Sequence, residues 1–361
     1  MGIIDLKASR CKHCYKCIRN CEVKAIMIRD GRAEIMEDRC ILCGTCLQIC
    51  PQSAKTLVSD LERVRGFLAD GDRVVVSMAP SYMGLLKFKE PGQVKAALKK
   101  LGFADVRETS EGAVLVTREY AALLEQGTME NIITTCCPSV NDLIEIYYPK
   151  LVPYLAPVVS PMIAHGRLLK KEYGADTKVV FLGPCIAKKK ESVDLRHNDC
   201  IDAVLNFQEV ESWLKQEQIE IQECEAEPLE RIDPKVNRLY PVTNGVVNSV
   251  LATEKQVDHY RKFYVHGIRN CIDLCESMVR GEINGCFIEM NSCSGGCIKG
   301  PTVEDRSISR FKVKLDMEEE KSASSFSSFV CPHAVRHKTV VSVPIIYLHL
   351  FFEFIFIMSF P

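Results

Sequence analysis

Eight cysteines near the start of the chain limit its fold more than any other feature. They fall at positions 11, 14, 17 and 21 and again at 40, 43, 46 and 50, each in the second set 29 residues after its counterpart. Both sets are Cys-x2-Cys-x2-Cys-x3-Cys runs, so the segment is an internal duplication. In a secreted protein such cysteines would form disulfides, but the N-terminal MGIIDLKASR lacks the apolar core of a signal peptide. We therefore expect a cytoplasmic setting, where thiols stay reduced and free to bind metal.

Thiolates are soft ligands that suit the tetrahedral iron of a cubane cluster. Three cysteines on one tight loop hold three irons, and in two-cluster ferredoxins the fourth cysteine of each run serves the other cluster. We therefore expect two [4Fe–4S] clusters in a small α+β module of the bacterial-ferredoxin type. One cluster would take Cys11, Cys14, Cys17 and Cys50, and the other Cys40, Cys43, Cys46 and Cys21. The alternative is zinc, which prefers four ligands per site with a longer gap between cysteine pairs.

The composition divides the chain into four parts. These are a cysteine-dense module (1–56), a short helical link (57–71), a large domain (72–305) and a linker with an apolar tail (306–361). In the module, Asp30-Gly31 between two apolar runs indicates a hairpin. In the large domain, short β-branched runs alternate with helical patterns, which predicts an α/β fold with a mostly parallel sheet. The expected strands are 74–76, 178–182 and 203–205, and the expected helices are 91–101, 114–125, 161–173, 208–216 and 270–280.

The last part of the chain is unusual. Residues 316–328 are expected to form a solvated linker, and 340–361 are strongly apolar and long enough to span a bilayer. Pro344, His349 and Glu353 interrupt this segment, and no basic flank follows it. It is open to three interpretations: an anchor, a buried or disordered tail, or a C-terminus altered by truncation or a frame change. We count neither a membrane nor, at a net charge of −1, nucleic acid among the expected partners.

Three segments of the large domain carry a second set of cysteines. TTCCPSV holds Cys136 and Cys137, GPCIAKKKES holds Cys185, and EMNSCSGGCIKGP holds Cys293 and Cys297. Cys137, Cys185, Cys293 and Cys297 would supply four thiolates from three distant segments, enough for a third cubane. Glycines 295 and 296 let the backbone approach an inorganic core closely. Each cysteine taken alone is equally consistent with a small buried apolar side chain.

In this order, the three segments resemble the catalytic-domain signatures of [FeFe]-hydrogenases. The family pattern is roughly Thr-Ser-Cys-Cys-Pro, then Pro-Cys-x2-Lys-x2-Glu, then Glu-x-Met-x-Cys-x-Gly-Gly-Cys. The segment APSY (79–82) resembles the family's Ala-Pro-Ser loop, and IEIYYPKL, SPMIAHG, CIDAVLNFQEV and PVTNGVVNSV also follow the family order. The resemblance covers residues 1 to about 301. It implies a two-lobed α/β domain with mostly parallel sheets flanked by helices, preceded by a ferredoxin domain.

The resemblance also implies an H-cluster, a cubane joined to a diiron subcluster that carries CO, cyanide and a bridging dithiolate. Its cubane would be held by Cys137, Cys185, Cys293 and Cys297, with Cys297 bridging to the diiron part. Lys188 would hydrogen-bond one cyanide and Ser81 the other, while Cys136 would pass protons. Glu191, from the same motif as Lys188, completes the candidate catalytic residues. The implied partners are H2 and protons, a ferredoxin or other redox protein, and the maturation proteins that build the diiron group.

The sequence departs from the family where protons are relayed. Two glutamates of the family relay fall on Tyr120 and Leu123, and its serine falls on Ala156, although Glu119 is one position away. The pocket differs too, at Met162, Gly183, Asn291 and the shortened Gly300-Pro301 segment. These changes leave the cluster ligands in place and predict low turnover, as in the sensory hydrogenases.

Two alternatives stay open. One is a non-catalytic relative such as the cytosolic iron–sulfur assembly factors, which keep cubanes without a diiron site; the other is a plain electron-transfer protein. Six further cysteines, at 200, 224, 271, 275, 286 and 331, are expected mainly to pack, with metal binding as the alternative for Cys331 near His333 and His337.

Overall fold

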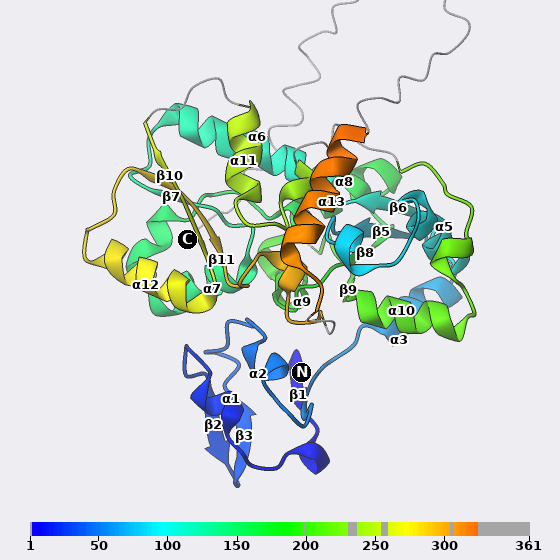
Figure 1. The fold of residues 1–361 in the computed structure, drawn as a ribbon, viewed down its shortest axis with the longest axis horizontal. Helices are drawn as coiled ribbons and strands as arrows, with labels where there is room; N and C mark the ends of the chain where they lie inside the picture. Colours follow the sequence, from blue (N-terminus) through cyan, green and yellow to red (C-terminus); the bar gives the residue numbers. More distant parts are fainter. Residues whose placement is uncertain (1, 198, 230–236, 254–258, 304–306, 324–361) are drawn as a thin grey trace, which may run out of the picture.

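The computed structural model describes residues 2–197, 199–229, 237–253, 259–303 and 307–323, and it contains a small N-terminal module below a larger two-lobed body (Figure 1). In the module, β1 (Ile4–Leu6) pairs antiparallel with β4 (Lys55–Leu57), and β2 (Ile26–Arg29) with β3 (Arg32–Ile35). Two one-turn helices, α1 (Lys16–Arg19) and α2 (Thr45–Gln48), follow the cysteine loops. The predicted α+β module is therefore present.

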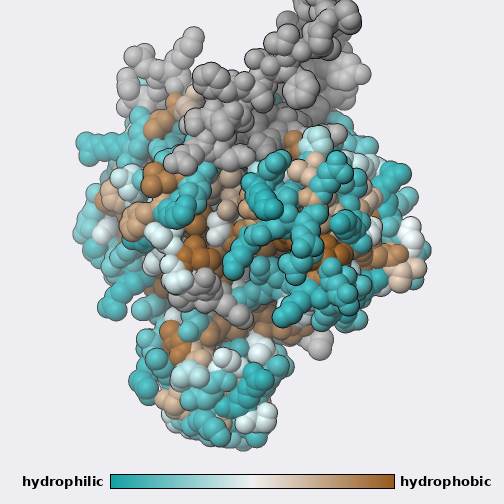
Figure 2. All heavy atoms as spheres, turned by 45° about the vertical axis from the view of Figure 1, so that its right-hand side comes forward, coloured by the Kyte–Doolittle hydropathy of each residue, from teal (hydrophilic) through white to brown (hydrophobic). Residues whose placement is uncertain are grey.

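The hairpin predicted at Asp30-Gly31 also forms. The φ angles of the two residues are 50° and 72°, the left-handed backbone that a two-residue type I′ turn requires. Seen as spheres, the module is the lower lobe; its visible surface is mainly hydrophilic, with hydrophobic side chains near the junction with the body (Figure 2).

The first lobe of the body is built on a parallel sheet with the strand order β6-β5-β8-β9. Its strands are β5 (Val74–Met78), β6 (Asp105–Glu108), β8 (Lys178–Leu182) and β9 (Ala203–Leu205). Its helices are α3 (Leu61–Ala69), α4 (Tyr82–Leu85), α5 (Gly92–Lys100), α8 (Pro161–Tyr173), α9 (Ala187–Ser192) and α10 (Phe207–Gln216). Every residue of β5 is buried, as expected for a central parallel strand covered on both faces.

The second lobe has a three-stranded parallel sheet with the order β10-β11-β7. The strands are β7 (Ile132–Ile133), β10 (Arg261–His266) and β11 (Cys286–Asn291). Its helices include α7 (Pro138–Tyr147), α11 (Gly245–Thr253) and α12 (Ile268–Val279). This arrangement confirms the expected two-lobed α/β body with parallel sheets. Short 3-10 turns lie at Ala8–Arg10, Pro149–Tyr154, Leu195–His197, Ile221–Glu223, Asn237–Leu239 and Cys297–Lys299.

The long helix α6 (Ser110–Gln126) packs against α8 at a point where only glycine fits. A Cβ built on Gly112 would lie 2.2 Å from the carbonyl oxygen of Pro161. The N-terminus of α8 is fixed by Ser160, whose Oγ accepts a hydrogen bond from the amide of Ile163 at 3.5 Å. Both helices therefore start at defined positions beside the segments that carry the candidate site residues.

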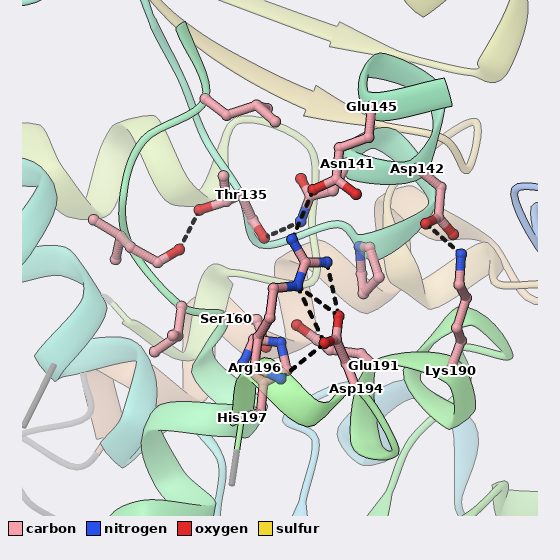
Figure 3. Close-up of a pocket in the computed structure, with 14 residues that line it drawn as sticks. Thr135, Asn141, Asp142, Glu145, Ser160, Lys190, Glu191, Asp194, Arg196 and His197 are labelled. Atoms are coloured by element: carbon pink, nitrogen blue, oxygen red, sulfur yellow. Dashed lines mark hydrogen bonds and ion pairs between the residues drawn. The ribbon is translucent and has the colours of Figure 1, made fainter. Parts of the chain in front are cut away.

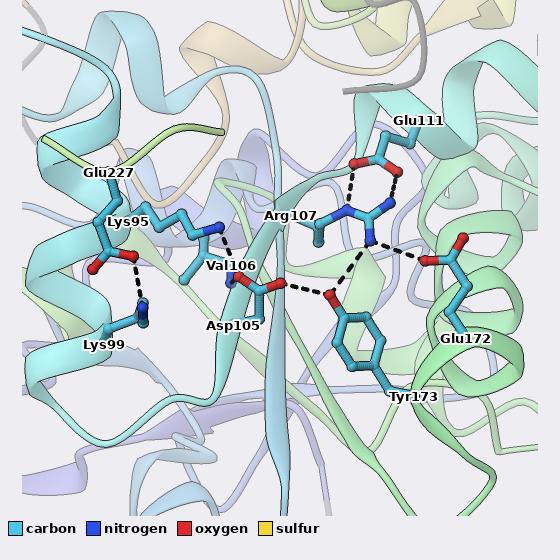
Figure 4. A network of polar contacts seen from close by, with 9 residues as sticks. All are labelled: Lys95, Lys99, Asp105, Val106, Arg107, Glu111, Glu172, Tyr173 and Glu227. Atoms are coloured by element: carbon cyan, nitrogen blue, oxygen red, sulfur yellow. Dashed lines mark hydrogen bonds and ion pairs between the residues drawn. The ribbon is translucent and has the colours of Figure 1, made fainter. Parts of the chain in front are cut away.

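A polar network ties β6 to α6 and α8 (Figure 4). The guanidinium of Arg107 is bonded to the carboxylate of Glu111 through two nitrogens and to Glu172 at 2.9 Å. The hydroxyl of Tyr173 donates to Asp105 at 2.5 Å. Because Arg107 and Glu111 are both buried, their ion pair is shielded from solvent and fixes the angle between strand and helix.

The structure differs from the sequence-based expectations at the C-terminal side. Residues 316–323, expected as solvated linker, belong to helix α13 (Arg310–Ala323). Val313 and Met317 on this helix are buried, and a Cβ on Gly84 would lie 2.2 Å from Val313. The linker expectation is therefore wrong for this part, because two apolar residues one turn apart are enough to pack a charged helix against α4.

The membrane question concerns other residues. Within the ranges that the structure describes, no helix is both long enough and apolar enough to cross a bilayer. The apolar segment 340–361 and Cys331 lie outside the described residues.

Candidate functional site

The eight cysteines of the module line two separate cavities. Cys11, Cys14, Cys17 and Cys50 line one, and Cys21, Cys40, Cys43 and Cys46 line the other. These are the two crossed sets expected from the spacing. The pKa of Cys40 is raised to about 11 and that of Cys46 to about 12, chiefly by burial, and Cys43 contributes to the rise in both. Such thiols lose their protons when iron binds, so both cysteines can serve as thiolate ligands of a cluster.

The cavity of the second set lies next to the large domain. Ile41 is fully buried in the same apolar core as Val140 and Leu143 of α7. A Cβ built on Gly44, whose φ is 75°, would lie 2.2 Å from Cβ of Pro301 and 3.2 Å from Cδ1 of Ile186. The loop that carries Cys43 and Cys46 is therefore in direct contact with segments that follow Cys185 and Cys297.

The docking of the module is fixed by polar contacts as well. The hydroxyl of Tyr147, at the end of α7, is 3.1 Å from the carbonyl oxygen of Val23 and 2.7 Å from that of Arg39. This single hydroxyl contacts two carbonyl groups of the module and so holds the module's second cysteine run against the second lobe.

The second cysteine constellation converges in the body. β7 leads to Cys137, the N-cap of α7; β8 leads to Cys185; and β11 leads to Cys293. The hydroxyl oxygen of Ser292 lies 3.7 Å from Sγ of Cys137 and 4.0 Å from Sγ of Cys293. Ligand sites at the carboxyl ends of parallel strands are the general rule in such sheets, and here two lobes contribute to one site.

The charges of these thiols interact strongly. The pKa of Cys185 is raised to about 11, chiefly by burial and also by the neighbouring Cys137. The pKa of Cys293 is raised far above its usual range. Burial is the largest cause, and Cys297, Cys185 and Cys137 contribute in the same direction. Neighbouring, partly buried thiols are costly as thiolates unless they share a cationic centre, which the iron of a cubane would provide.

The spacing of the thiols also bears on the kind of metal. Among the residues that the structure describes, no three side chains of His, Cys, Asp or Glu converge as a single ion would need. The module's cysteines instead surround cavities. A cubane, which places each thiolate on a different iron, fits this arrangement.

The glycines before Cys297 have a local reason. Gly295 and Gly296 have φ angles of 93° and 85°, and a Cβ on Gly296 would lie 2.3 Å from the carbonyl oxygen of Pro241. The amide of Cys297 donates to the same oxygen at 2.7 Å. The glycine pair therefore lets the loop turn sharply against the 241–243 backbone and brings Cys297 back toward the other thiols.

Lys188 is the most enclosed cation of the site. Its Nζ donates to Oε2 of Glu191 at 2.5 Å, to Oγ of Ser160 at 2.8 Å and to the carbonyl oxygen of Cys136 at 3.4 Å. Burial opposes the charge on Lys188, but Glu191 outweighs it, so the pKa of Lys188 is raised. The ammonium group stays charged and is held close to Cys136 by three acceptors.

The 79–82 loop lies beside the second cysteine segment. The amide of Ala79 donates to the carbonyl oxygen of Leu182 at 2.8 Å, so the loop leaves β5 next to the end of β8. Ser81 in this loop is fully buried, and its Oγ has no hydrogen-bond partner in the part of the chain that the structure describes. Buried hydroxyls without a partner are rare in proteins, and Ser81 is the feature of the site that most calls for a bound group.

The residues at the expected proton-relay positions are all buried. Tyr120 is fully enclosed, and its hydroxyl is 3.4 Å from Sγ of Cys136, whereas Leu123 and Ala156 are apolar and inaccessible. The pKa of Cys136 is raised to about 12, chiefly by burial. For Glu119, burial alone raises the pKa. Tyr120, rather than Glu119, is therefore the α6 residue that contacts Cys136.

The altered pocket residues fit their surroundings. A Cβ on Gly183 would lie 2.6 Å from the ring of Phe181 and 3.1 Å from Cβ of Ala79, so a larger side chain would need those neighbours to move. Met162 is buried, and the Nδ2 of Asn291 donates to Glu289 at 2.9 Å. Asn291 is thus directed toward Glu289 by a hydrogen bond that a methionine at this position cannot make.

A polar pocket that no sequence motif predicts lies beside Ser160, the residue that accepts a hydrogen bond from Lys188 (Figure 3). Its lining includes Thr135, Glu191 and residues of α7 and of the 194–197 turn. No motif contains these residues together, because they come from positions 135 to 197 and meet only in the folded chain. Their sequence signals are Thr135 and Pro138 of the first cysteine segment, Ser160 of the Ser-Pro segment, and Lys190 and Glu191 of the second cysteine segment.

Of the other cysteines, Cys271 and Cys275 are fully buried on α12 in the core of the second lobe. Cys200, Cys224 and Cys286 are also buried. All described cysteines are free of disulfides. The expectation that these five pack is consistent with their positions.

Comparisons with known proteins place this geometry in a family. Residues 72–301 match the family described as iron only hydrogenase large subunit, C-terminal domain, and residues 10–54 match the 4Fe-4S dicluster domain. Iron hydrogenase 1 of Clostridium pasteurianum is 26% identical over 323 residues, which cover 73% of this chain and 56% of that protein. The periplasmic [Fe] hydrogenase large subunit of Nitratidesulfovibrio vulgaris is 28% identical over 361 residues, 74% of this chain and 85% of that protein. The chain thus spans little more than half the length of the Clostridium relative.

Two further similarities extend the picture. A solved structure of an [FeFe]-hydrogenase variant from Chlamydomonas reinhardtii has a TM-score of 0.60 at 19% identity, covering 72% of this chain and 88% of that one. A probable cytosolic Fe-S cluster assembly factor of Brugia malayi is 21% identical over 348 residues, 79% of this chain and 75% of that protein. The family match over most of the chain, the shared fold and the converging cysteines lead to one conclusion: the chain belongs to the iron-only hydrogenase large-subunit family, with a two-cluster ferredoxin-type module ahead of the family domain.

Proposed function

We propose that this protein is an [FeFe]-hydrogenase-type oxidoreductase that interconverts H2 with protons and electrons at an H-cluster. The observation that carries the proposal is the buried hydroxyl of Ser81, which has no partner among the described residues although it lies at the end of β5 beside the cysteine site. Leaving such a group unpaired costs about 1–3 kcal/mol, so a donor kept there indicates a polar ligand. A protein that held only a cubane would have no use for it.

Lys188 supports the same proposal. It is a charged group with little exposure, held by Glu191, Ser160 and the Cys136 carbonyl. Its position close to Cys136 and to the thiols suits an anionic ligand such as cyanide, which would take one of its hydrogen bonds. When bound, the diiron group would supply the site where H2 is split or formed, while Lys188 and Ser81 would orient it from opposite sides. Cys136 would hold the proton that enters or leaves.

The same proposal gives the module a role. Its two [4Fe–4S] clusters would pass electrons between a ferredoxin or another redox protein and the buried cubane. The set with Cys43 would be the inner one, because the Gly44 loop contacts Pro301 and Ile186. The set with Cys14, which is exposed, would be the outer one. Maturation proteins would have to deliver the diiron group, and a reducing, cytoplasmic setting would keep the thiols free until then.

We further propose that turnover is low and that the protein reports H2 or redox state rather than carrying metabolic flux. Leu123 and Ala156 stand where proton carriers are expected, and both are buried apolar residues. General acid–base groups contribute about 10²–10⁴-fold to rates, so their loss would slow proton supply without affecting the cluster ligands.

A second candidate function is that of a non-catalytic iron–sulfur assembly factor. The similarity to the Brugia malayi protein over 79% of the chain favours it. It would need the cubane thiols but neither the Lys188–Glu191 pair nor the Ser81 hydroxyl, and therefore ranks second.

The experiment that decides between them is infrared spectroscopy of anaerobically purified protein after exposure to the maturation proteins. A hydrogenase-type site requires CO and cyanide stretching bands. Ser81→Ala should shift one cyanide band, since it removes one hydrogen bond. The matched control is Ser249→Ala, because Ser249 is also buried but donates to a carbonyl within its own helix. If no CO or cyanide bands appear in protein whose cubanes are intact, the assembly-factor function replaces the proposal.

A further inference from the structure

The hydroxyl of Tyr120 connects two groups that are otherwise separate. It lies 3.4 Å from Sγ of Cys136 and 3.2 Å from Oγ1 of Thr135. It also accepts the backbone amide of Thr135 at 2.8 Å. These three contacts fix the position of the hydroxyl in a fully buried environment. Tyr120 is therefore an ordered polar link on the inner side of α6, at a position where the family has a glutamate.

Thr135 continues this link toward the outside. Its Oγ1 donates to the carbonyl oxygen of Val158 at 2.5 Å, and its side chain lines the polar pocket of Figure 3. The contacts permit one consistent order of donors: the thiol of Cys136 to Tyr120, Tyr120 to Thr135, and Thr135 to Val158. Rotation of the Thr135 hydroxyl toward the pocket would extend this series of hydrogen bonds to water.

The pocket is suited to water. Its cavity has a volume of about 50 Å³, which leaves room for a few water molecules. Three of its polar atoms, Oδ1 of Asn141, Oδ2 of Asp142 and Nδ1 of His197, are buried and have no hydrogen-bond partner among the described residues. Buried polar atoms of this kind are normally satisfied by ordered water. At the pocket's outer side, Arg196 and Glu145 form an ion pair with partly exposed side chains, 43% and 28%.

We propose that Tyr120 and Thr135 form a hydroxyl relay that carries protons between this pocket and the sulfur of Cys136. The inference rests on the proposed function and adds the route by which protons reach it. Each time the thiol of Cys136 has given its proton up on the inner side, a pocket water gives a proton to Oγ1 of Thr135, Thr135 gives its own to the oxygen of Tyr120, and Tyr120 gives its own to the sulfur, which becomes a thiol again. Each hydroxyl gains one proton and releases one, so neither changes charge, and each then rotates back.

Tyr120 and Thr135 act through Cys136 and are positioning residues rather than catalytic ones. The alternative carriers have no comparable contacts: Leu123 and Ala156 have no polar side-chain atom. A second hydroxyl pair nearby, Thr117 and Tyr240 at 2.6 Å, has no hydrogen bond to Cys136. That pair supplies a matched control, because Thr117 lies on α6 with Tyr120 and its partner Tyr240 takes no part in the relay.

The first test follows the Cys136 thiol itself. Protein that holds its [4Fe–4S] clusters but has not met the maturation proteins is transferred into D2O, and the S–H infrared band removed by Cys136→Ala is followed with time. The relay predicts that Tyr120→Phe and Thr135→Val slow the exchange of this band at least tenfold. Thr135→Ser, which keeps the hydroxyl, and Tyr240→Phe should exchange at the wild-type rate within about twofold.

The two relay variants also protect the test from folding failure. Tyr120→Phe leaves the Thr135 amide unpaired, whereas Thr135→Val keeps the shape of the side chain and that amide contact. If Tyr120→Phe does not fold, the Thr135→Val and Thr135→Ser pair gives the same comparison. In matured protein, Thr135→Val should lower H2 evolution on the order of 10²-fold with unchanged CO and cyanide bands.

The outcomes separate the two proposals. Absent CO and cyanide bands overturn the proposed function, while the exchange of the Cys136 thiol still reports on the relay. Present bands with equal exchange in wild type, Tyr120→Phe and Thr135→Val overturn the relay alone. Slow exchange in Tyr240→Phe, or in Thr135→Ser to the same degree as in Thr135→Val, also overturns it, because packing rather than the hydroxyls would then control access.

Discussion

Gly44→Ala is the change that most directly probes how the ferredoxin-type module is held against the large domain. The φ of Gly44 is 75°, a conformation that costs an L-residue about 1–2 kcal/mol. The added methyl group would also lie 2.2 Å from Cβ of Pro301 and 3.2 Å from Cδ1 of Ile186. Overpacking of this kind costs typically about 1–3 kcal/mol. We expect a total loss of about 2–5 kcal/mol in the free energy of unfolding, with the module displaced from the domain.

Gly31→Ala is the matched control. Gly31 belongs to the same module and has a φ of 72°, but a Cβ there would have nothing within 4 Å. It should therefore lose only the backbone part, about 1–2 kcal/mol. The difference between the two variants isolates the contact between the module and the domain. The double change Gly44→Ala with Pro301→Gly removes the nearest clashing atoms and should recover most of that difference.

Both variants are measured by anaerobic urea titration of the cluster-loaded protein, followed by the visible absorbance of the clusters and by tryptophan fluorescence. In electron paramagnetic resonance of the reduced protein, Gly44→Ala should also weaken the magnetic interaction between the clusters of the module and the proposed cubane of the large domain. Gly31→Ala should leave this interaction unchanged. Equal losses of stability in the two glycine variants would refute the reasoning. A double variant no more stable than Gly44→Ala would do the same.

Three further predictions follow from other parts of the structure. Arg107→Leu should lower the free energy of unfolding by about 3–5 kcal/mol, because it leaves Glu111 buried and unpaired; urea titration measures this, and Arg29→Leu at the exposed Arg29–Glu34 pair should cost less than about 1 kcal/mol. Mainly because of burial, the pKa of Glu289 is raised from 4.5 to about 7, so the folded state holds this proton more tightly than the unfolded state. Stability should therefore fall as pH rises from about 5 to about 7 and then level off, and Glu289→Gln should remove this fall; an unchanged pH profile in the variant would contradict it. Cys50→Ser should disturb the cluster of the first cysteine run and not that of the second; iron analysis with electron paramagnetic resonance would detect the opposite outcome.

Much of the fold and the grouping of the cysteines follow from the sequence for a physical reason. Iron–sulfur ligation depends on short, fixed spacings, so the runs around Cys11 and Cys40 carry their geometry within a few residues. The central strands β5 and β8 are buried on both faces and therefore appear as unbroken apolar runs. The strand β10 escapes this criterion because four of its residues, including Phe263 and Tyr264, are exposed at the edge of its sheet.

The features that the sequence could not reveal depend on contacts between distant segments. Tyr120 and Thr135 are adjacent only because α6 and the segment after β7 fold together, and no short motif joins them. The alignment with the family marks Tyr120 only as a lost glutamate. Its contact with Cys136, which turns a loss into a candidate replacement, depends on the depth of α6 in the body. Likewise α13 is a charged sequence whose two buried residues, Val313 and Met317, give only a weak apolar pattern.

The crossed cysteine sets of the module have a consequence for how the protein is made. Each cavity takes three thiols from one run and one from the other, Cys50 in the first and Cys21 in the second. During synthesis, the second cavity is incomplete until residue 46 has left the ribosome and the first until residue 50, so neither cluster can be inserted while only the first cysteine run has emerged. A lesion at one thiol opens a cavity that both runs share. Both clusters should therefore be inserted only after both runs have been synthesised, and a chain that stops before residue 46 should hold neither cluster.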